Sequence, residues 1–222
     1  MPRLLASDTN TLQTTLLLDD LDTRFARRHT SLDVDSCVPC LRWLARFHAH
    51  HLGSTGNGLW PVGSYWHLQT RADEFAVMAD SDLKQAAAAL DAKLNNTAYQ
   101  SLVHGDAKVA NMCFSENNQD VAMVDFQYVG KGCGMRDVAY FLGSCLDDND
   151  CERHADKLLS LYFTELTNHV PDKDKVPIET QWRALYSTAW ADFHRFLAGW
   201  MPEHGKINRY MQRMTDDALK RL

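Results

Sequence analysis

The sequence predicts an α+β fold that is mainly helical. Two pairs of short apolar runs, each separated by a polar turn, are typical of β-hairpins, and five longer segments place apolar residues three and four positions apart. The chain has 222 residues, of which 45% are hydrophobic and 23% charged, as in ordinary globular proteins. We therefore expect one globular unit with a single sizeable core.

The first expected element is an N-terminal β-hairpin. Residues 2–7 and 14–18 have the pattern of strands on either side of the polar turn 8–10. Two strands alone bury too little surface to be stable in water, so either the rest of the chain covers this hairpin or its partners are absent. Its open edge near Leu16 could pair with another copy of the chain, which would give a homodimer.

Helical periodicity accounts for most of the remaining chain. The segments with apolar residues at helical spacing are 38–52, 81–94, 135–146, 153–168 and 179–199. Prolines 171, 177 and 202 are expected to separate or end the later helices. Near the C-terminus, Trp182, Trp190, Phe193, Phe196 and Trp200 follow the helical period and indicate core positions.

An aromatic loop at residues 59–67 follows the first helix. Trp60, Tyr65, Trp66 and His67 offer broad ring surfaces, which fit either the wall of an acceptor pocket or packing between helices. Both interpretations stay open from the sequence.

The strongest functional signal is the segment His104-Gly-Asp-Ala-Lys-Val-Ala-Asn111, followed across a second expected hairpin by Asp125-Phe126-Gln127. Phosphoryl transfer needs a carboxylate beside the attacking hydroxyl group, and it needs carboxylate and neutral oxygen ligands that hold magnesium against nucleotide phosphates. Asp106, Asn111 and Asp125 supply these groups. Taken singly, Asp106 also fits a turn and Asn111 a strand-end cap.

This pattern resembles the catalytic and metal-binding loops of the aminoglycoside phosphotransferase and choline kinase-like (ecdysteroid kinase-like) families, whose fold is protein-kinase-like. Those families carry His-Gly-Asp, four residues, Asn, and then an Asp that opens a short loop. Every fixed position matches in this chain. The resemblance extends to residues 16–21, which are similar to the linker along the adenine, to residues 42–48, and to the segment 136–140.

The resemblance implies a role for each matching residue. Asp106 would be the catalytic base, Lys108 would touch the transferred phosphate, and Asn111 and Asp125 would bind Mg²⁺. The residues expected to bind ATP are Leu18, Asp19, Asp20 and Leu21. Those expected to support the site are His104, Gly105 and Asp137.

Two neighbouring features have simpler interpretations. Asp137 begins an apolar helical run, so capping of that helix fits it as well as bracing of the catalytic loop. Gly130, Gly132 and Gly134 follow the second motif, where a flexible activation-type loop is expected rather than a phosphate cradle.

The resemblance also implies a division of the chain. Residues 1–18 would be the remnant of a kinase N-terminal lobe, 19–28 the hinge, and 29–222 the helical C-terminal lobe with its catalytic and metal-binding loops. The glycine-rich loop and the strand lysine of such kinases do not precede Leu16, so this polypeptide is expected to be weakly active or inactive. The two function classes are thus an ATP- and Mg²⁺-dependent kinase of a small-molecule alcohol, and a kinase-derived pseudo-enzyme that binds a ligand or partner.

Charge and cysteine content narrow the possible partners, location and cysteine chemistry. The net charge of −6 argues against binding to nucleic acid or to an anionic membrane, and no apolar run is long enough to cross a bilayer, so a cytoplasmic location is expected. The six cysteines are expected to be reduced. Cys37 and Cys40 form a C-x-x-C pair, but no second pair completes a zinc site.

Overall fold

The computed structural model describes all residues from 1 to 222, and it confirms a mainly helical α+β fold. Its helices are α1 (Cys37–His50), α2 (Ala72–Val77), α3 (Asp82–Asn95), α4 (Met135–Cys145), α5 (Asp148–Thr167), α6 (Asp172–Trp200) and α7 (Arg209–Leu219), with short 3-10 helices at Leu21–Thr23, Leu68–Thr70 and Val109–Asn111. None of these helices has the length and apolarity required to span a bilayer.

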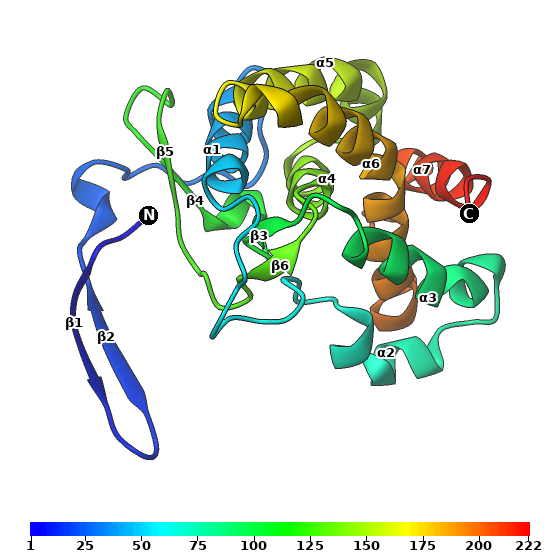
Figure 1. Ribbon diagram of the computed structural model, residues 1–222, viewed down its shortest axis with the longest axis horizontal. Coiled ribbons are helices and arrows are strands. Elements are labelled where there is room, and N and C mark those ends of the chain that lie inside the picture. The colour runs from blue at the N-terminus through cyan, green and yellow to red at the C-terminus, as the bar shows by residue number, and fades with distance from the viewer.

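The helices form one body (Figure 1), and a continuous apolar core lies among them. Helix α1 packs along α5, and α6 contacts α3, α4 and α7. Trp66, Trp182 and Trp190 are fully buried where these elements meet. Burial of such large rings contributes a major part of the hydrophobic stabilisation.

Three two-stranded antiparallel sheets accompany the helices. The N-terminal hairpin consists of β1 (Leu4–Thr9) and β2 (Thr14–Leu18), and the second hairpin of β4 (Met112–Phe114) and β5 (Val121–Met123). The third sheet joins β3 (Ser101–Val103) to β6 (Gly130–Gly132), with Leu102 opposite Lys131. This last pairing places the segment that precedes the His104–Asn111 motif next to the segment that follows Asp125-Phe126-Gln127.

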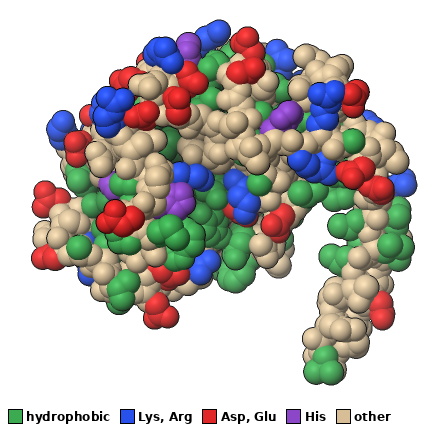
Figure 2. Space-filling model, turned by 180° about the vertical axis from the view of Figure 1, so that it is seen from behind, with side chains coloured by type: hydrophobic (Ala, Val, Ile, Leu, Met, Phe, Trp, Pro, Cys, Tyr) green, Lys and Arg blue, Asp and Glu red, His purple; other side chains and the backbone are tan.

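The N-terminal hairpin stands away from the helical body. Figure 2 shows it as a separate arm with hydrophobic side chains on its surface, and every residue of both strands is exposed. The exposed apolar residues of its strands are Leu4, Leu5, Leu16, Leu17 and Leu18. The rest of the chain therefore does not cover the hairpin, and its pairing with a second copy stays a prediction.

Two expectations about the helices and loops were wrong, and one helix was not expected. Pro177 does not separate two helices but is the sixth residue of α6, close to its N-terminus, where a proline removes only one early hydrogen bond of a 29-residue helix. The segment expected as a flexible loop contains β6, because Gly130 packs so closely on Trp60 that a Cβ atom there would lie 2.3 Å from the Trp60 carbonyl oxygen. Helix α7 was not predicted at all.

Candidate active site

The first motif forms a tight loop between β3 and β4. Gly105 has a φ of +79°, and a Cβ atom at this position would lie 2.4 Å from the carbonyl oxygen of Tyr128. A left-handed backbone and a close backbone approach both require glycine. Gly105 therefore fixes how closely the motif loop and the loop after Asp125 pack together.

Asp106 is buried, with 3% of its surface exposed, yet one of its oxygens is free. Its Oδ2 accepts hydrogen bonds from Nζ of Lys108 at 2.8 Å and from Nδ2 of Asn111 at 3.0 Å. Its Oδ1 has no partner. Since buried carboxylate oxygens are normally hydrogen-bonded, the unpaired Oδ1 is an exception that suggests a missing donor, such as a ligand hydroxyl group.

His104 holds the loop from inside. Its Nδ1 accepts the backbone N–H of Asp106 at 3.2 Å, and its Nε2 lies 2.9 Å from the carbonyl oxygen of Val124. One nitrogen therefore accepts and the other donates, as in a neutral imidazole. Through Val124, His104 ties the first motif to the residue directly before Asp125.

Asp137 connects the loop to the core rather than capping α4 alone. Its Oδ1 accepts the N–H of Gly105 at 3.0 Å, and its Oδ2 accepts the N–H of His104 at 2.6 Å and lies 3.1 Å from Nε2 of His48. Burial opposes ionisation of Asp137, but the hydrogen bonds from the side chain of His48 and the backbone N–H of His104 help to outweigh it, and the pKa of Asp137 is lowered. The bracing contacts exist, and they use both carboxylate oxygens.

Asn111 and Asp125 are brought together by backbone pairing. The N–H of Val124 donates to the carbonyl oxygen of Asn111 at 3.0 Å, which sets Asp125 beside the end of the first motif. Asp125 is exposed, and its φ of 65° is unusual for a residue other than glycine. A strained backbone at a polar residue is typical of functional sites.

The chemistry of these two side chains fits magnesium. Nδ2 of Asn111 is engaged by Asp106, which leaves its amide oxygen to accept a metal, and the Asp125 carboxylate makes no ion pair or hydrogen bond with the protein. No group of three His, Cys, Asp or Glu side chains gathers anywhere in the chain. Mg²⁺ commonly takes one or two protein ligands and completes its shell with phosphates and water, so two ligands suffice.

The expected nucleotide-binding residues lie where the hairpin ends. Leu18 closes β2, Asp19 exchanges hydrogen bonds with Arg3, and Asp20 caps the short helix that starts at Leu21. No hydrogen bond or ion pair joins them to the motif loop. Their role in binding adenine stays a prediction.

A pocket of about 340 Å³ opens over Asp106. Aromatic rings from four separate parts of the chain form its walls, and Gln127, Lys108, His204 and Lys206 add polar groups. The aromatic and aliphatic lining residues are Tyr65, Tyr128, Tyr140, Phe193, Leu197 and Trp200. An apolar cavity with a few polar groups is the usual form of a small-molecule site.

Two phenols lie near Asp106 in this pocket. The rings of Tyr65 and Tyr140 are 5.6 Å apart. Burial raises the pKa of Tyr65 to about 12, and burial together with Tyr65 and Asp106 raises the pKa of Tyr140. Both hydroxyl groups therefore stay protonated near neutral pH and can donate hydrogen bonds.

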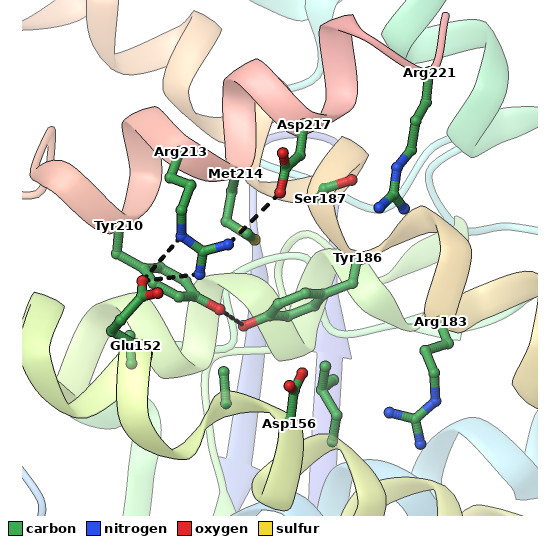
Figure 3. Close-up of a pocket in the computed structure, with 13 residues that line it drawn as sticks. Glu152, Asp156, Arg183, Tyr186, Ser187, Tyr210, Arg213, Met214, Asp217 and Arg221 are labelled. Atoms are coloured by element: carbon green, nitrogen blue, oxygen red, sulfur yellow. Dashed lines mark hydrogen bonds and ion pairs between the residues drawn. The ribbon is translucent and has the colours of Figure 1, made fainter.

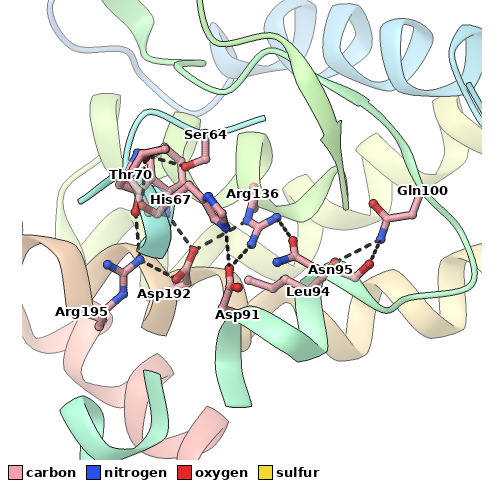
Figure 4. Close-up of polar contacts among 11 residues, drawn as sticks. Ser64, His67, Thr70, Asp91, Leu94, Asn95, Gln100, Arg136, Asp192 and Arg195 are labelled. Atoms are coloured by element: carbon pink, nitrogen blue, oxygen red, sulfur yellow. Dashed lines mark hydrogen bonds and ion pairs between the residues drawn. The ribbon is translucent and has the colours of Figure 1, made fainter. Parts of the chain in front are cut away.

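The aromatic loop at residues 59–67 both lines the pocket and packs between helices, through different residues. Tyr65 lines the pocket, whereas Trp66 packs inside the core and donates from Nε1 to Oδ2 of Asp192 at 3.0 Å. Figure 4 shows the buried polar cluster that holds this loop: Arg195 donates to the Trp66 carbonyl oxygen at 2.9 Å and to Asp192 at 2.8 Å. The cluster anchors the loop that carries Tyr65.

Arg136 links the same cluster to helix α3. Its guanidinium is fully buried and donates to Asn95 at 2.8 Å and to Asp91 at 3.2 Å, while Asp192 lies 3.7 Å from its Nε. Arg136 precedes Asp137, which braces the motif loop. Neighbouring residues at the start of α4 thus fix both the motif loop and one wall of the pocket.

A second pocket, of about 250 Å³, lies between α5, α6 and α7 (Figure 3). Arg213 pairs there with Glu152 at 2.8 Å and with Asp217 at 3.6 Å, and the hydroxyl of Tyr210 donates to that of Tyr186. None of the motif residues lines it. Its internal ion pairs connect α5 to α7 and indicate a structural role.

The six cysteines are core residues. All six are buried as free thiols, and Sγ of Cys37 lies 3.8 Å from Sγ of Cys145 rather than next to Cys40. Burial raises the pKa of Cys40 well above its usual value. These thiols behave as small core residues.

The fold is that of small-molecule kinases with a protein-kinase-like architecture. Aminoglycoside phosphotransferase APH(3'')-Id from Streptomyces rimosus ATCC10970 is similar with a TM-score of 0.51 at 13% identity, over 83% of this chain and 74% of that one. The same protein in complex with ADP and streptomycin gives a TM-score of 0.50 at 14% identity, over 83% and 75% of the two chains. A choline/ethanolamine kinase family protein from Mesorhizobium loti gives 0.50 at 13% identity, over 99% and 71%.

Within this class, the sequence identifies the family. The model of the ecdysteroid kinase-like family matches residues 64–175, which is half of the chain and includes both motifs. The chain belongs to the ecdysteroid kinase-like family. No curated protein matches it in sequence.

Sequence reasoning missed much of the pocket. Tyr140 and Lys206 line it, but neither belongs to a motif, and Phe193 was interpreted as core alone. Tyr140 lies within the segment 136–140 that carries the family resemblance, so that segment held a usable signal. Lys206 lies in a short polar stretch after α6, and nothing in the sequence there indicated a pocket residue.

Proposed function

We propose that this protein transfers the γ-phosphoryl group of ATP to a hydroxyl group of a small molecule. The observation that carries the proposal is buried Asp106 in the lining of the pocket, whose Oδ2 is held by Lys108 and Asn111 while its Oδ1 has no hydrogen-bond partner. A carboxylate with one fixed and one free oxygen is suited to orient a hydroxyl group and accept its proton.

In the proposed reaction, the hydroxyl oxygen of the acceptor attacks the γ-phosphorus. The bond from that phosphorus to the bridging oxygen of ADP breaks, ADP leaves, and Asp106 takes the hydroxyl proton. Mg²⁺, held by Asn111 and Asp125, would neutralise charge on the phosphates. Lys108, whose Nζ lies 2.8 Å from Oδ2 of Asp106, would contact the transferred phosphoryl group.

On this proposal residues 1–18 act as the remnant of an upper lobe, 19–28 as the hinge and 29–222 as the catalytic lobe. Binding of Mg-ATP needs only the ligands of the nucleotide and the metal, whereas transfer also needs the acceptor, so binding is the more direct first test.

Saturating Mg-ATP is expected to stabilise the folded protein. A ligand at a hundred times its dissociation constant adds about 2.7 kcal/mol to the free energy of unfolding, which a thermal-shift titration measures as a raised melting temperature. Asp125→Ala should lose most of the shift, because it removes the charged metal ligand. Asp156→Ala, which removes an exposed carboxylate from α5, is the matched control and should keep the full thermal shift.

Equal shifts for wild type and Asp125→Ala, or no shift for either protein, would reject nucleotide binding at this site. In that case the pocket over Asp106 would point to a kinase-derived binding module, which binds its small molecule without transferring phosphate.

A further inference from the structure

Lys206 occupies a defined position at the rim of the pocket over Asp106. It lies in the turn between α6 and α7, and its backbone N–H donates to Nδ1 of His204 at 3.1 Å. Its ammonium group lies over two aromatic faces, 5.1 Å from the ring centre of Tyr140 and 5.9 Å from that of Phe193. These cation–π contacts direct the side chain into the pocket.

The ammonium group of Lys206 has no acidic partner. It forms no ion pair within the chain, and the only carboxylate that lines the pocket is Asp106, whose Oδ2 is already bonded to Lys108. Burial, together with the charge of Lys108, lowers the pKa of Lys206. A half-buried ammonium without a counter-ion gains free energy from any anion that binds beside it.

The formal charge of the pocket is accordingly positive. Two lysines face one carboxylate, and burial together with Lys206 lowers the pKa of His204, which leaves that imidazole neutral near pH 7. A ligand that carries an ammonium group would lose hydration and meet two like charges. A ligand with a carboxylate at one end would find a donor for it, and a flat body would lie between the aromatic walls.

We propose that the acceptor is an alcohol with an acidic group, in which the acidic group binds the ammonium of Lys206, the apolar body lies between Tyr140, Phe193 and Trp200, and the hydroxyl group reaches Asp106. This inference rests on the proposed function for the role of the hydroxyl group. It makes Lys206 the residue that selects acceptors by charge.

Three matched probes test the inference without nucleotide. They are 4-(hydroxymethyl)benzoate, 4-(hydroxymethyl)benzamide and 4-(hydroxymethyl)benzylamine, which share one ring and one hydroxymethyl group and differ in charge. Dissociation constants are measured by NMR titration against the full chain. The wild type should bind the benzoate at least about tenfold more tightly than the benzylamine, because a charged hydrogen bond in a half-buried site is worth that ratio.

Substitutions at Lys206 should change the preference for the benzoate over the benzylamine according to the charge of the new side chain. Lys206→Arg should keep it, Lys206→Met should bring the two dissociation constants within about twofold, and Lys206→Glu should favour the benzylamine. Lys157→Met, which removes an exposed lysine from α5, is the control and should leave the preference unchanged. Circular dichroism of each variant checks that the fold is retained.

Three results would overturn the inference: equal or reversed preference in the wild type, an unchanged preference in Lys206→Met, or no binding of any probe. Weaker Mg-ATP binding in Lys206→Met, with unchanged probe binding, would instead assign Lys206 to the nucleotide phosphates and also overturn it. Because the titration contains no ATP, failure of phosphoryl transfer leaves this test intact and counts only against the proposed function.

Discussion

Replacing Asp137 with alanine should destabilise the protein by about 3–5 kcal/mol. The fully buried carboxylate accepts the N–H groups of His104 and Gly105 and is paired with His48. Its removal leaves two backbone donors and Nε2 of His48 without partners in the core, and each unpaired buried group costs about 1–3 kcal/mol. Urea denaturation of the wild type and the variant measures the difference.

The same contact should make stability fall in acid. The pKa of Asp137 in the folded protein is lower than in the unfolded chain, whose aspartates titrate near 3.9. The contribution of Asp137 to the free energy of unfolding is therefore fully present above that value and is lost as the pH falls through the folded-state pKa.

Asp156→Ala is the matched control for Asp137→Ala and should change the free energy of unfolding by less than about 0.5 kcal/mol. If Asp137→Ala lowers the free energy of unfolding by less than about 1 kcal/mol, the motif loop does not depend on its hydrogen bonds to Asp137.

Replacing Asp106 with asparagine should abolish transfer while leaving Mg-ATP binding intact. The amide keeps the size of the carboxylate but cannot take a proton, and loss of general base catalysis lowers rates about 10²- to 10⁴-fold. Single-turnover transfer of labelled γ-phosphate, with the protein in excess and long incubation, detects a slow wild-type reaction. Asp156→Asn should react at the wild-type rate. Equal transfer by Asp106→Asn and wild type would exclude Asp106 as the base.

Contiguity in the sequence determined what could be predicted of the site. Asp106, Asn111 and their neighbours lie within eight residues, His104 to Asn111, so their spacing is visible without any structure. Asp125 follows at the end of a recognisable hairpin. The walls of the pocket come from residues far apart in the chain, such as Tyr65 and Phe193, which come together because Trp66, next to Tyr65, is hydrogen-bonded to Asp192 on α6.

The fold shows the same division between local and non-local signals. Helices such as α1 and α3 follow from their periodicity, whereas β6 is three residues long with glycine at both ends and forms because β3 and Trp60 lie beside it. Propensity alone argues against a strand there. Helix α7 differs, since Tyr210, Met211, Met214 and Ala218 show helical spacing that was sufficient to predict it.

The most direct test of the reaction centre is the binding of Mn²⁺-ATP, followed by electron paramagnetic resonance, with Mn²⁺ in place of Mg²⁺. With only two protein ligands for the metal, we predict protein-bound Mn²⁺ when ATP is present and very little without it. Asn111→Ala and Asp125→Ala should each weaken the complex at least about tenfold, and Asp106→Asn should not. Complexes of equal strength in all four proteins would contradict the assignment of the metal site.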